Sequence, residues 1–250
     1  MNRRIGAAFA AVVLSCATIG SGPALAQEKS AVRDGLTLPA GSVRILLVRP
    51  GITVGEQSTG GMFEPNADWT EQARRQVATA LSIAQTKLGN EIVTVEEPIG
   101  PAAERLADYR ALFSVVAESV VVYKFFPGNR LPSKKRQGVF DWTLGPGVKN
   151  IPGAEGADYA LFITTEDQYG STGRKVAQIF AAFAGVGITS GVHKGFAGLV
   201  DLKTGDLVWL NADLQMGGDV RTPEGATRRV DQLLEDFPGK PVTLAAKTAE

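Results

Sequence analysis

The chain has 250 residues, of which 44% are hydrophobic and 21% charged, and its 26 basic side chains balance 26 acidic ones. This composition is that of an ordinary globular protein, and the even charge gives no electrostatic reason to expect a nucleic-acid partner. The single cysteine and single histidine exclude a disulfide framework within the chain and argue against metal sites built from Cys and His.

Residues 1–26 have the three parts of a secretory signal peptide. A basic start, Met1-Asn2-Arg3-Arg4, precedes an apolar stretch from Ile5 to Leu14, and Ala24-Leu25-Ala26 forms a small-residue exit. The apolar stretch is shorter than a membrane span requires. We therefore predict export and cleavage after Ala26, which places the protein in the periplasm.

A second processing site lies within the same segment. Val13-Leu14-Ser15-Cys16 resembles a loose lipoprotein signal, in which Cys16 would carry lipid and anchor the protein to the outer membrane. We favour simple cleavage because its exit motif is well formed and follows the helix-breaking Ser21-Gly22-Pro23. Lipidation of Cys16 stays open as the alternative.

The first elements follow a polar segment. Residues 27–41 have no sustained period and predict a flexible leader, so we expect the fold to begin at Ser42. The β-branched and leucine-rich run Ser42–Val48, closed by Arg49-Pro50-Gly51, predicts a buried strand, and a Gly-rich loop should follow it.

Two helices and a short strand are expected next. Asp68, with Glu71 three residues later, predicts a capped helix that ends near Gly89. A strand over Glu91–Val95 should precede a helix from Pro101 to about Val122. The end of that helix is β-branched and could be partly extended.

A long Pro- and Gly-rich loop is predicted over residues 127–156, around an apolar island at 139–144 that should pack back on the domain. Asp158–Glu166 predicts a strand, and Phe196–Asp201 with Leu207–Asn211 predicts a hairpin. Thr222-Pro223 is typical of a helix start. The order of elements indicates one compact α/β domain over residues 42–238, with helices packed against a mixed β-sheet, and residues 239–250 as a flexible tail.

No motif predicts a catalytic, metal or cofactor residue. His193 has no partner that the sequence identifies, and the carboxylates on or near strands are no more than any α/β domain carries. An envelope glycan hydrolase that uses two facing carboxylates is therefore retained only as an alternative function.

The most unusual stretch is residues 176–192, seventeen residues without a charge, rich in Ala and Gly. We favour a buried helix over residues 175–184, and the alternative is a segment that contacts lipid or an oligomer interface. Candidate interaction residues are aromatic: Trp142, Phe180, Phe183 and Trp209, with both tryptophans more typical of the core.

Three blocks carry a resemblance to known proteins. Ile45–Val48 with Phe63–Thr70, Gly156–Phe162 and Gly195–Asn211 together resemble a group of uncharacterised exported proteins of proteobacteria. More distantly, the hairpin around Lys203-Thr204-Gly205-Asp206 is similar to one in envelope proteins of the curli-secretion lipoprotein, penicillin-binding-protein activator and Tol-Pal amino-terminal-domain type. This resemblance implies an α/β fold that docks to other envelope proteins; the matching positions are structural and carry over no functional residue.

These observations favour a non-enzymatic accessory protein, periplasmic or associated with the outer membrane, that binds other proteins of the cell envelope. Peripheral or lipid-anchored membrane association is compatible with this function. The alternatives are a membrane-contacting homo-oligomer that uses residues 176–192 and a carboxylate-dependent glycan hydrolase.

Overall fold

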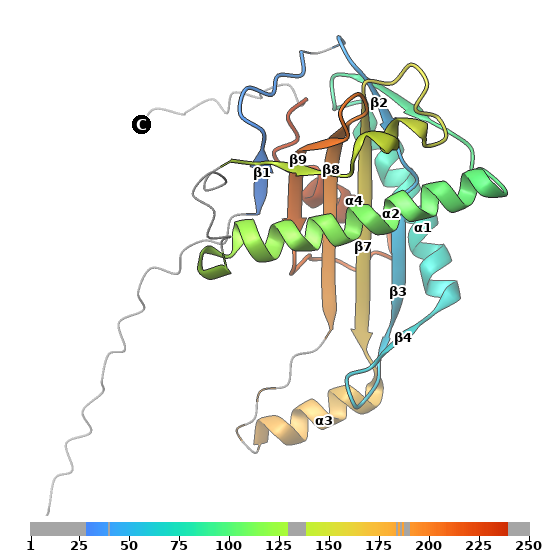
Figure 1. Ribbon diagram of the computed structural model, residues 1–250. Coiled ribbons are helices and arrows are strands. Elements are labelled where there is room, and N and C mark those ends of the chain that lie inside the picture. Colours follow the sequence, from blue (N-terminus) through green and yellow to red (C-terminus); the bar gives the residue numbers. More distant parts are fainter. Residues whose placement is uncertain are drawn as a thin grey trace, which may run out of the picture.

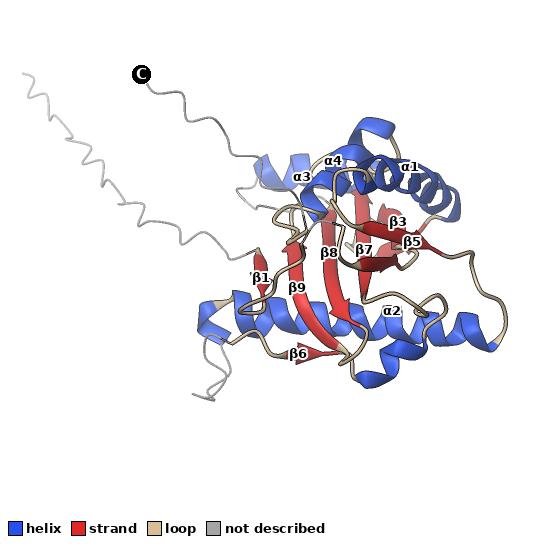
Figure 2. Ribbon diagram, turned by 90° about the horizontal axis from the view of Figure 1, so that it is seen from above, coloured by secondary structure: helices blue, strands red, loops and turns tan. Residues whose placement is uncertain are grey.

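The computed structural model describes residues 29–39, 41–129, 139–183, 185, 187 and 191–239. Within them, nine strands form one mixed sheet with helices on both faces (Figures 1 and 2). The strands are β1 (Ser30–Val32), β2 (Arg44–Leu47), β3 (Gly51–Gln57), β4 (Phe63–Pro65), β5 (Glu91–Thr94), β6 (Trp142–Thr143), β7 (Tyr159–Gly170), β8 (Val192–Asp201) and β9 (Asp206–Asp213). The helices are α1 (Ala67–Gln85), α2 (Pro101–Val120), α3 (Thr172–Phe183) and α4 (Pro223–Leu233), with short helical turns at Val121–Phe125, Pro127–Asn129 and Pro146–Asn150.

The sheet has the strand order β1-β9-β8-β7-β2-β5. β7 is parallel to β2 and antiparallel to β8, and β3 continues along β7 beyond the end of β2. β4 returns along β3, and β6 pairs with β9. α1 and α4 cover one face of the sheet and α2 covers the other (Figure 2). The predicted fold class, α/β with a mixed sheet in one compact domain, is confirmed.

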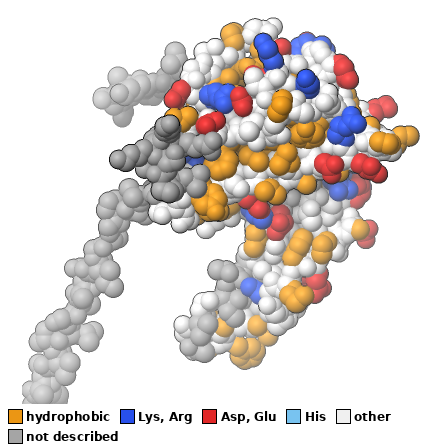
Figure 3. Space-filling view, viewed as in Figure 1, with side chains coloured by type: hydrophobic (Ala, Val, Ile, Leu, Met, Phe, Trp, Pro, Cys, Tyr) orange, Lys and Arg blue, Asp and Glu red, His pale blue; other side chains and the backbone are white. Residues whose placement is uncertain are grey.

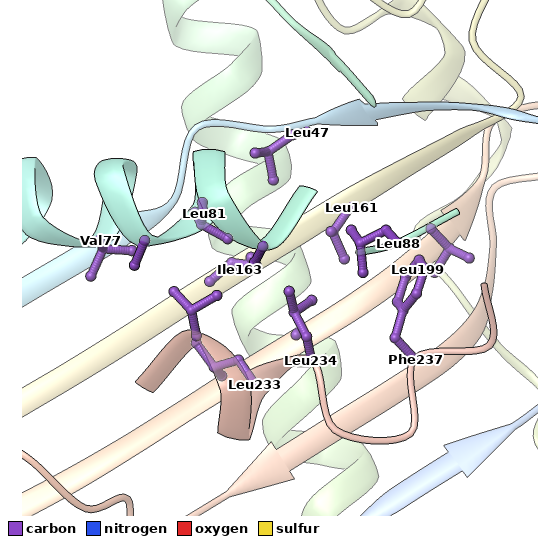
Figure 4. Packing of buried hydrophobic residues seen from close by; sticks show 14 of the residues in the cluster. Leu47, Val77, Leu81, Leu88, Leu161, Ile163, Leu199, Leu233, Leu234 and Phe237 are labelled. Carbon is purple, nitrogen blue, oxygen red and sulfur yellow. The ribbon is translucent and has the colours of Figure 1, made fainter. Parts of the chain in front are cut away.

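The core has two parts because the side chains of a strand alternate between the faces of its sheet. On β7, Leu161 and Ile163 pack against α1 and α4 (Figure 4), whereas Ala160 and Phe162 pack on the side of α2. Both faces are therefore buried, which explains the nearly continuous apolar run of this strand.

Several predicted elements are confirmed. The side chain of Thr222 accepts a hydrogen bond from the Gly225 N–H at 3.1 Å and caps α4. β8 and β9 form the predicted hairpin. The apolar island packs back on the domain, because Phe140 and Leu144 are buried and Trp142–Thr143 pairs with β9.

The prediction of a flexible leader before Ser42 is wrong over part of residues 27–41. Ser30–Val32 forms β1, which adds antiparallel to β9, and Leu38 is buried in the core. Three residues are too few to show a strand period, so the backbone of β9, rather than a local pattern, determines this strand. The predicted signal peptide and residues 240–250 of the predicted tail lie outside the described residues.

The region around α1 differs from the prediction in two respects. Gly51–Gln57, expected in the turn and loop after the first strand, is β3, with Ile52 and Val54 buried. α1 is capped by Asn66, whose side chain accepts from the Trp69 N–H at 2.9 Å, and not by Asp68. Both side chains suit this position, so local chemistry alone does not select between them.

The end of the second helix is not extended. α2 runs to Val120 and continues as a π-helical turn through Phe125. Phe113, Ala117, Val120 and Phe125 are buried in the α2 side of the core. This packing outweighs the weak preference of β-branched residues for strands.

Candidate contact surface

α3 lies beyond the ends of β7 and β8, away from the two helix layers (Figure 1). Ser171 begins the helix: its side chain accepts from the Arg174 N–H at 3.1 Å, and its own N–H donates to the Gln57 carbonyl at 3.0 Å. The helix is thereby joined to the ends of both β7 and β3. Hydrophobic side chains show on the surface of this projection in Figure 3.

One face of α3 is apolar and exposed. Val176, Ile179, Phe180 and Phe183 recur at helical spacing, and their exposed fractions are 46%, 57%, 69% and 86%. The favoured prediction of a buried helix over residues 175–184 is therefore wrong, since the helix extends past the part of the sheet that the other helices cover. Residues 184, 186 and 188–190 of the charge-free stretch lie outside the described residues.

The loop between β3 and β4 adds to this surface. It lies against the start of α3: a Cβ on Gly173 would be 2.5 Å from Thr59 Oγ1, and one on Gly61 would be 3.1 Å from the Arg174 guanidinium. Met62 in the same loop is 73% exposed. We call the five exposed apolar side chains the apolar tip; they are Met62, Val176, Ile179, Phe180 and Phe183.

The residues next to the apolar tip carry charges of both signs, since Glu64, two residues after Met62, is exposed. The sequence has no Asp or Glu between Asp167 and Asp201. Lys175, in the first turn of α3, is exposed. On α3, the tip therefore combines exposed apolar side chains with a nearby positive charge.

Behind the tip, a buried charge network joins β7, β8 and α4. Asp167 and Arg229 are both completely buried, and Arg229 Nη2 donates to Asp167 Oδ1 at 2.7 Å while Nη1 donates to Oδ2 at 3.2 Å. His193 Nδ1 lies 2.8 Å from Asp167 Oδ1. Such a bidentate pair has strong geometry and is costly to leave incomplete.

The sequence identified no partner for His193, and the structure provides Asp167. The pairing could have been predicted from the sequence only with the strand register, because Asp167 and His193 lie opposite each other once β7 and β8 pair in this antiparallel register. Among the described residues, no hydroxyl or thiol group forms a hydrogen bond with the His193 imidazole. With Asp167 shared with Arg229, the arrangement is that of a structural network.

A second cluster lies beside this network. Arg221 donates from Nε and Nη2 to Asp219 at 2.9 and 2.7 Å, and its guanidinium lies 4.4 Å from the centre of the Trp69 ring and 4.1 Å from that of Tyr169. Tyr169 donates to Asp219 Oδ1 at 3.0 Å. Burial first, then the nearby Asp167 carboxylate, raises the pKa of Tyr169. The cluster ties α1 and the start of α4 to the end of β7.

Asp219 should make stability depend on pH. Hydrogen bonds from the Arg221 side chain lower the pKa of Asp219 from 3.8 to about 2, against the effect of burial. A lowered pKa stabilises the folded state above the unfolded value, and this contribution is lost as pH falls from about 4 towards 2. We expect Asp219→Asn to lower the free energy of unfolding at pH 7 and the difference from the wild type to shrink over that interval, as measured by urea unfolding. Asp108→Asn, on exposed α2 surface, is the control; an Asp219→Asn difference that stays constant down to pH 2 would contradict this assignment.

The two tryptophans lie in the body of the domain. Trp209 is 1% exposed and packs edge-on against Phe237, with ring centres 5.2 Å apart, so its candidate role in a contact surface is wrong in this structure. It points inward because β9 is covered by helices on both sides. Trp142 is half-buried against the core on the side of α2. Phe180 and Phe183 are exposed, as a contact role requires, and that role stays a prediction.

The predicted strand carboxylates do not form a pair in one cleft. Among the carboxylates on or near β7, β8 and β9, only that of Glu166 lines the cleft beside α2. The carboxylate of Glu118, on α2, belongs to the same lining. Lys194 Nζ lies between the two, 3.1 Å from Glu118 Oε1 and 3.3 Å from Glu166 Oε2. Both carboxylates therefore pair with one ammonium, which is the arrangement of an ion-pair cluster.

The described part of the chain offers neither a membrane-spanning helix nor a metal site. No helix there is long and apolar enough to cross a membrane, and no group of three or more His, Cys, Asp or Glu side chains is placed to hold a metal ion. Cys16 lies outside the described residues, and its lipidation stays a prediction.

No family model and no curated protein matches this sequence. Among solved structures, the PelC dodecamer from Paraburkholderia phytofirmans matches 86% of this chain and 100% of its own, with 13% identity and a TM-score of 0.32. Lipoprotein GNA1162 from Neisseria meningitidis matches 68% and 80% of the two chains, with 17% identity and a TM-score of 0.26. The LpoB C-terminal domain from Salmonella enterica matches 73% and 88%, with 16% identity and a TM-score of 0.23. These scores are too low for the likeness to carry an argument about this chain.

Proposed function

We propose that this protein is an accessory component of the bacterial cell envelope that acts by binding, and that its apolar tip lies against a lipid surface. The observation that carries the proposal is the exposed apolar face of α3 at the projecting end of the sheet. A short amphipathic helix with Phe on one face and a basic residue near it is typical of helices that lie in a membrane interface.

The entry of the chain into the domain supports this orientation. β1 pairs with β9 so that Ser30 lies opposite Asn211, and the Lys29 carbonyl accepts from the Ala212 N–H at 2.7 Å. This is the end of β9 that lies next to the start of β8, and therefore on the side of α3. Lys29, the first described residue, thus lies on the side of the domain that carries the apolar tip.

The length of the segment between Cys16 and Lys29 bears on the lipid-anchored alternative. A fully extended chain from Cys16 to Lys29 spans at most about 45 Å. We propose that a lipid on Cys16 would hold the domain near the membrane that the apolar tip contacts. With cleavage after Ala26, the tip alone would provide a weaker, reversible contact.

The test is binding of the processed protein to vesicles of phosphatidylethanolamine and phosphatidylglycerol, measured by co-sedimentation. Burying a Phe side chain contributes about 1.5–3 kcal/mol, so we expect Phe183→Ser to weaken binding about tenfold or more. Val115→Ser is the matched control, because Val115 on α2 is 60% exposed but lies outside the tip. Equal binding by both variants would rule out the tip as the lipid contact.

Self-association through the same surface is the competing outcome. Exposed apolar side chains also follow α2 and its end, at Leu112, Val115, Val122, Tyr123 and Phe126. Two different apolar surfaces on one molecule permit a head-to-tail contact between copies. If sedimentation velocity shows an oligomer that Phe183→Ser dissociates, while the wild type leaves vesicles unbound, a homo-oligomer replaces the lipid contact.

A further inference from the structure

A cleft of about 550 Å³ lies beside α2, on the face of the sheet that α2 partly covers. It is separate from the apolar tip. Its walls come from α2, β3, β7 and β8, from the links that follow β2 and β5, and from Arg74 of α1. The volume is within the range of sites that hold small molecules. The apolar tip contributes no residue to it.

The topology places this cleft where α/β sheets commonly bind ligands. β2 and β5 are parallel, and the cleft-lining residues Arg49 and Glu97 come shortly after their carboxyl ends. The helix that leads to β5, α1, and the helix that leaves it, α2, lie on opposite faces of the sheet. In open α/β sheets a crevice forms outside the strand ends where successive connections take opposite faces.

One end of the cleft has an excess of positive charge. Arg49 forms an ion pair with Glu97, and Arg110 Nη2 lies 3.5 Å from the same carboxylate. Arg110 Nη1 also lies 3.5 Å from the Arg49 carbonyl. Both contacts of Arg110 are at the outer limit of hydrogen bonding, so its guanidinium retains donors for an anionic group.

The other end of the cleft holds two carboxylates, those of Glu118 and Glu166. Glu118 and Glu166 share the single ammonium of Lys194, and Gln168 donates to Glu166 Oε1 at 2.6 Å. Burial lowers the pKa of Lys194, but its bonds to Glu118 and the charge of Glu166 outweigh this and raise the pKa overall. Lys194 thus stays cationic and is shared by the two carboxylates. Arg74 of α1 is a further cation in the cleft lining, and its Nη1 lies 3.9 Å from Glu71 Oε2.

We propose that this cleft binds a small zwitterion, a short peptide with free termini, whose carboxylate meets Arg49 and Arg110 and whose ammonium meets Glu118 and Glu166. A guanidinium with spare donors suits a carboxylate, and carboxylates with spare lone pairs suit an ammonium. The inference stands apart from the lipid contact, since the two sites share no residue.

The experiment titrates the processed protein with di-, tri- and tetraglycine, each in three forms: free termini, N-acetylated, and C-amidated. Binding is measured by isothermal titration calorimetry. We expect at least one free-terminal peptide to bind about tenfold more tightly than either of its capped forms, because each cap removes one charge-assisted contact. Absence of binding by all three lengths, or equal binding of free and capped forms, would overturn the proposal.

Two variants identify the ends of the site. Arg110→Gln should abolish the preference over the amidated peptide, and Glu118→Gln the preference over the acetylated one. Arg105→Gln, on the same helix but outside the cleft lining, is the control and should keep both preferences. Circular dichroism confirms that each variant is folded, and unchanged preferences in both cleft variants would locate the binding elsewhere and contradict the proposal. Vesicle binding should be the same in all three variants.

Discussion

Asp167→Asn is expected to lower the free energy of unfolding by about 3–5 kcal/mol, the range observed when one partner of a buried ion pair is removed. Asp167 and Arg229 are completely buried, and the carboxylate accepts two bonds from the guanidinium. The variant leaves the Arg229 charge inside the protein without its counter-charge. Arg229 Nε already lacks a hydrogen-bond partner, so little else is in place to compensate. Equilibrium unfolding in urea at neutral pH measures the loss.

Two further variants separate the cost of an unpaired charge from the loss of a contact. Asp167→Leu combined with Arg229→Met replaces the pair by apolar side chains of similar size and should recover most of the stability. His193→Gln should cost much less, because the His193 side chain is 27% exposed and keeps access to water. A loss below about 1 kcal/mol for Asp167→Asn would mean that water reaches the pair and that it is not a buried network.

Elements with short-range signals were predictable from the sequence. Thr222 caps α4 by a bond to the N–H three residues later, and the turn Lys203-Thr204-Gly205-Asp206 joins β8 to β9. Their chemistry is contained within a few residues, so a local pattern carries it. The long strand at β7 was predictable for a related reason, because burial on both faces leaves a continuous apolar run.

Elements that depend on partners distant in the sequence were not predictable. β1 is a strand because β9 offers an unpaired edge, and nothing in Ser30–Val32 itself shows this. The apolar face of α3 was visible in the sequence, but whether it faces a core or solvent depends on which elements reach it. Length and composition alone favoured burial, and the extension of β7 to Gly170 carries the helix beyond the covered sheet.

The network at the base of α3 also needed the register of the sheet. Asp167 and His193 are 26 residues apart and meet only as cross-strand neighbours. Arg229 had a weak signal of its own, a charged residue that falls among the buried Ala226, Val230 and Leu233 of α4. An arginine on the apolar face of a helix indicates a buried acidic partner, although not which one.

Gly205→Ala is expected to lower the free energy of unfolding by about 3 kcal/mol, from about 1–2 kcal/mol for a left-handed backbone and about 1 kcal/mol for each hydrogen bond lost. Gly205 has a φ of 84°, and a Cβ there would lie 2.1 Å from the Gly145 carbonyl oxygen. The Gly205 carbonyl accepts from the Leu144 N–H at 2.8 Å and from Thr143 Oγ1 at 2.9 Å. The added methyl would therefore displace the segment that closes over the β8–β9 turn.

Gly35→Ala is the control that separates the free-energy cost of a left-handed backbone from the cost of the steric clash at Gly205. Gly35 has a φ of 76°, but no atom lies within 4 Å of the position of its Cβ, so only the backbone cost of about 1–2 kcal/mol applies. The free energies of unfolding of the two variants, measured in urea, should differ by the contribution of the hydrogen bonds and packing that hold Leu144 in place. Equal losses would mean that the island at residues 139–144 moves aside at no cost. A larger loss at Gly205 would show that this turn, predictable from its sequence, is also the point where the long loop is fastened to the sheet.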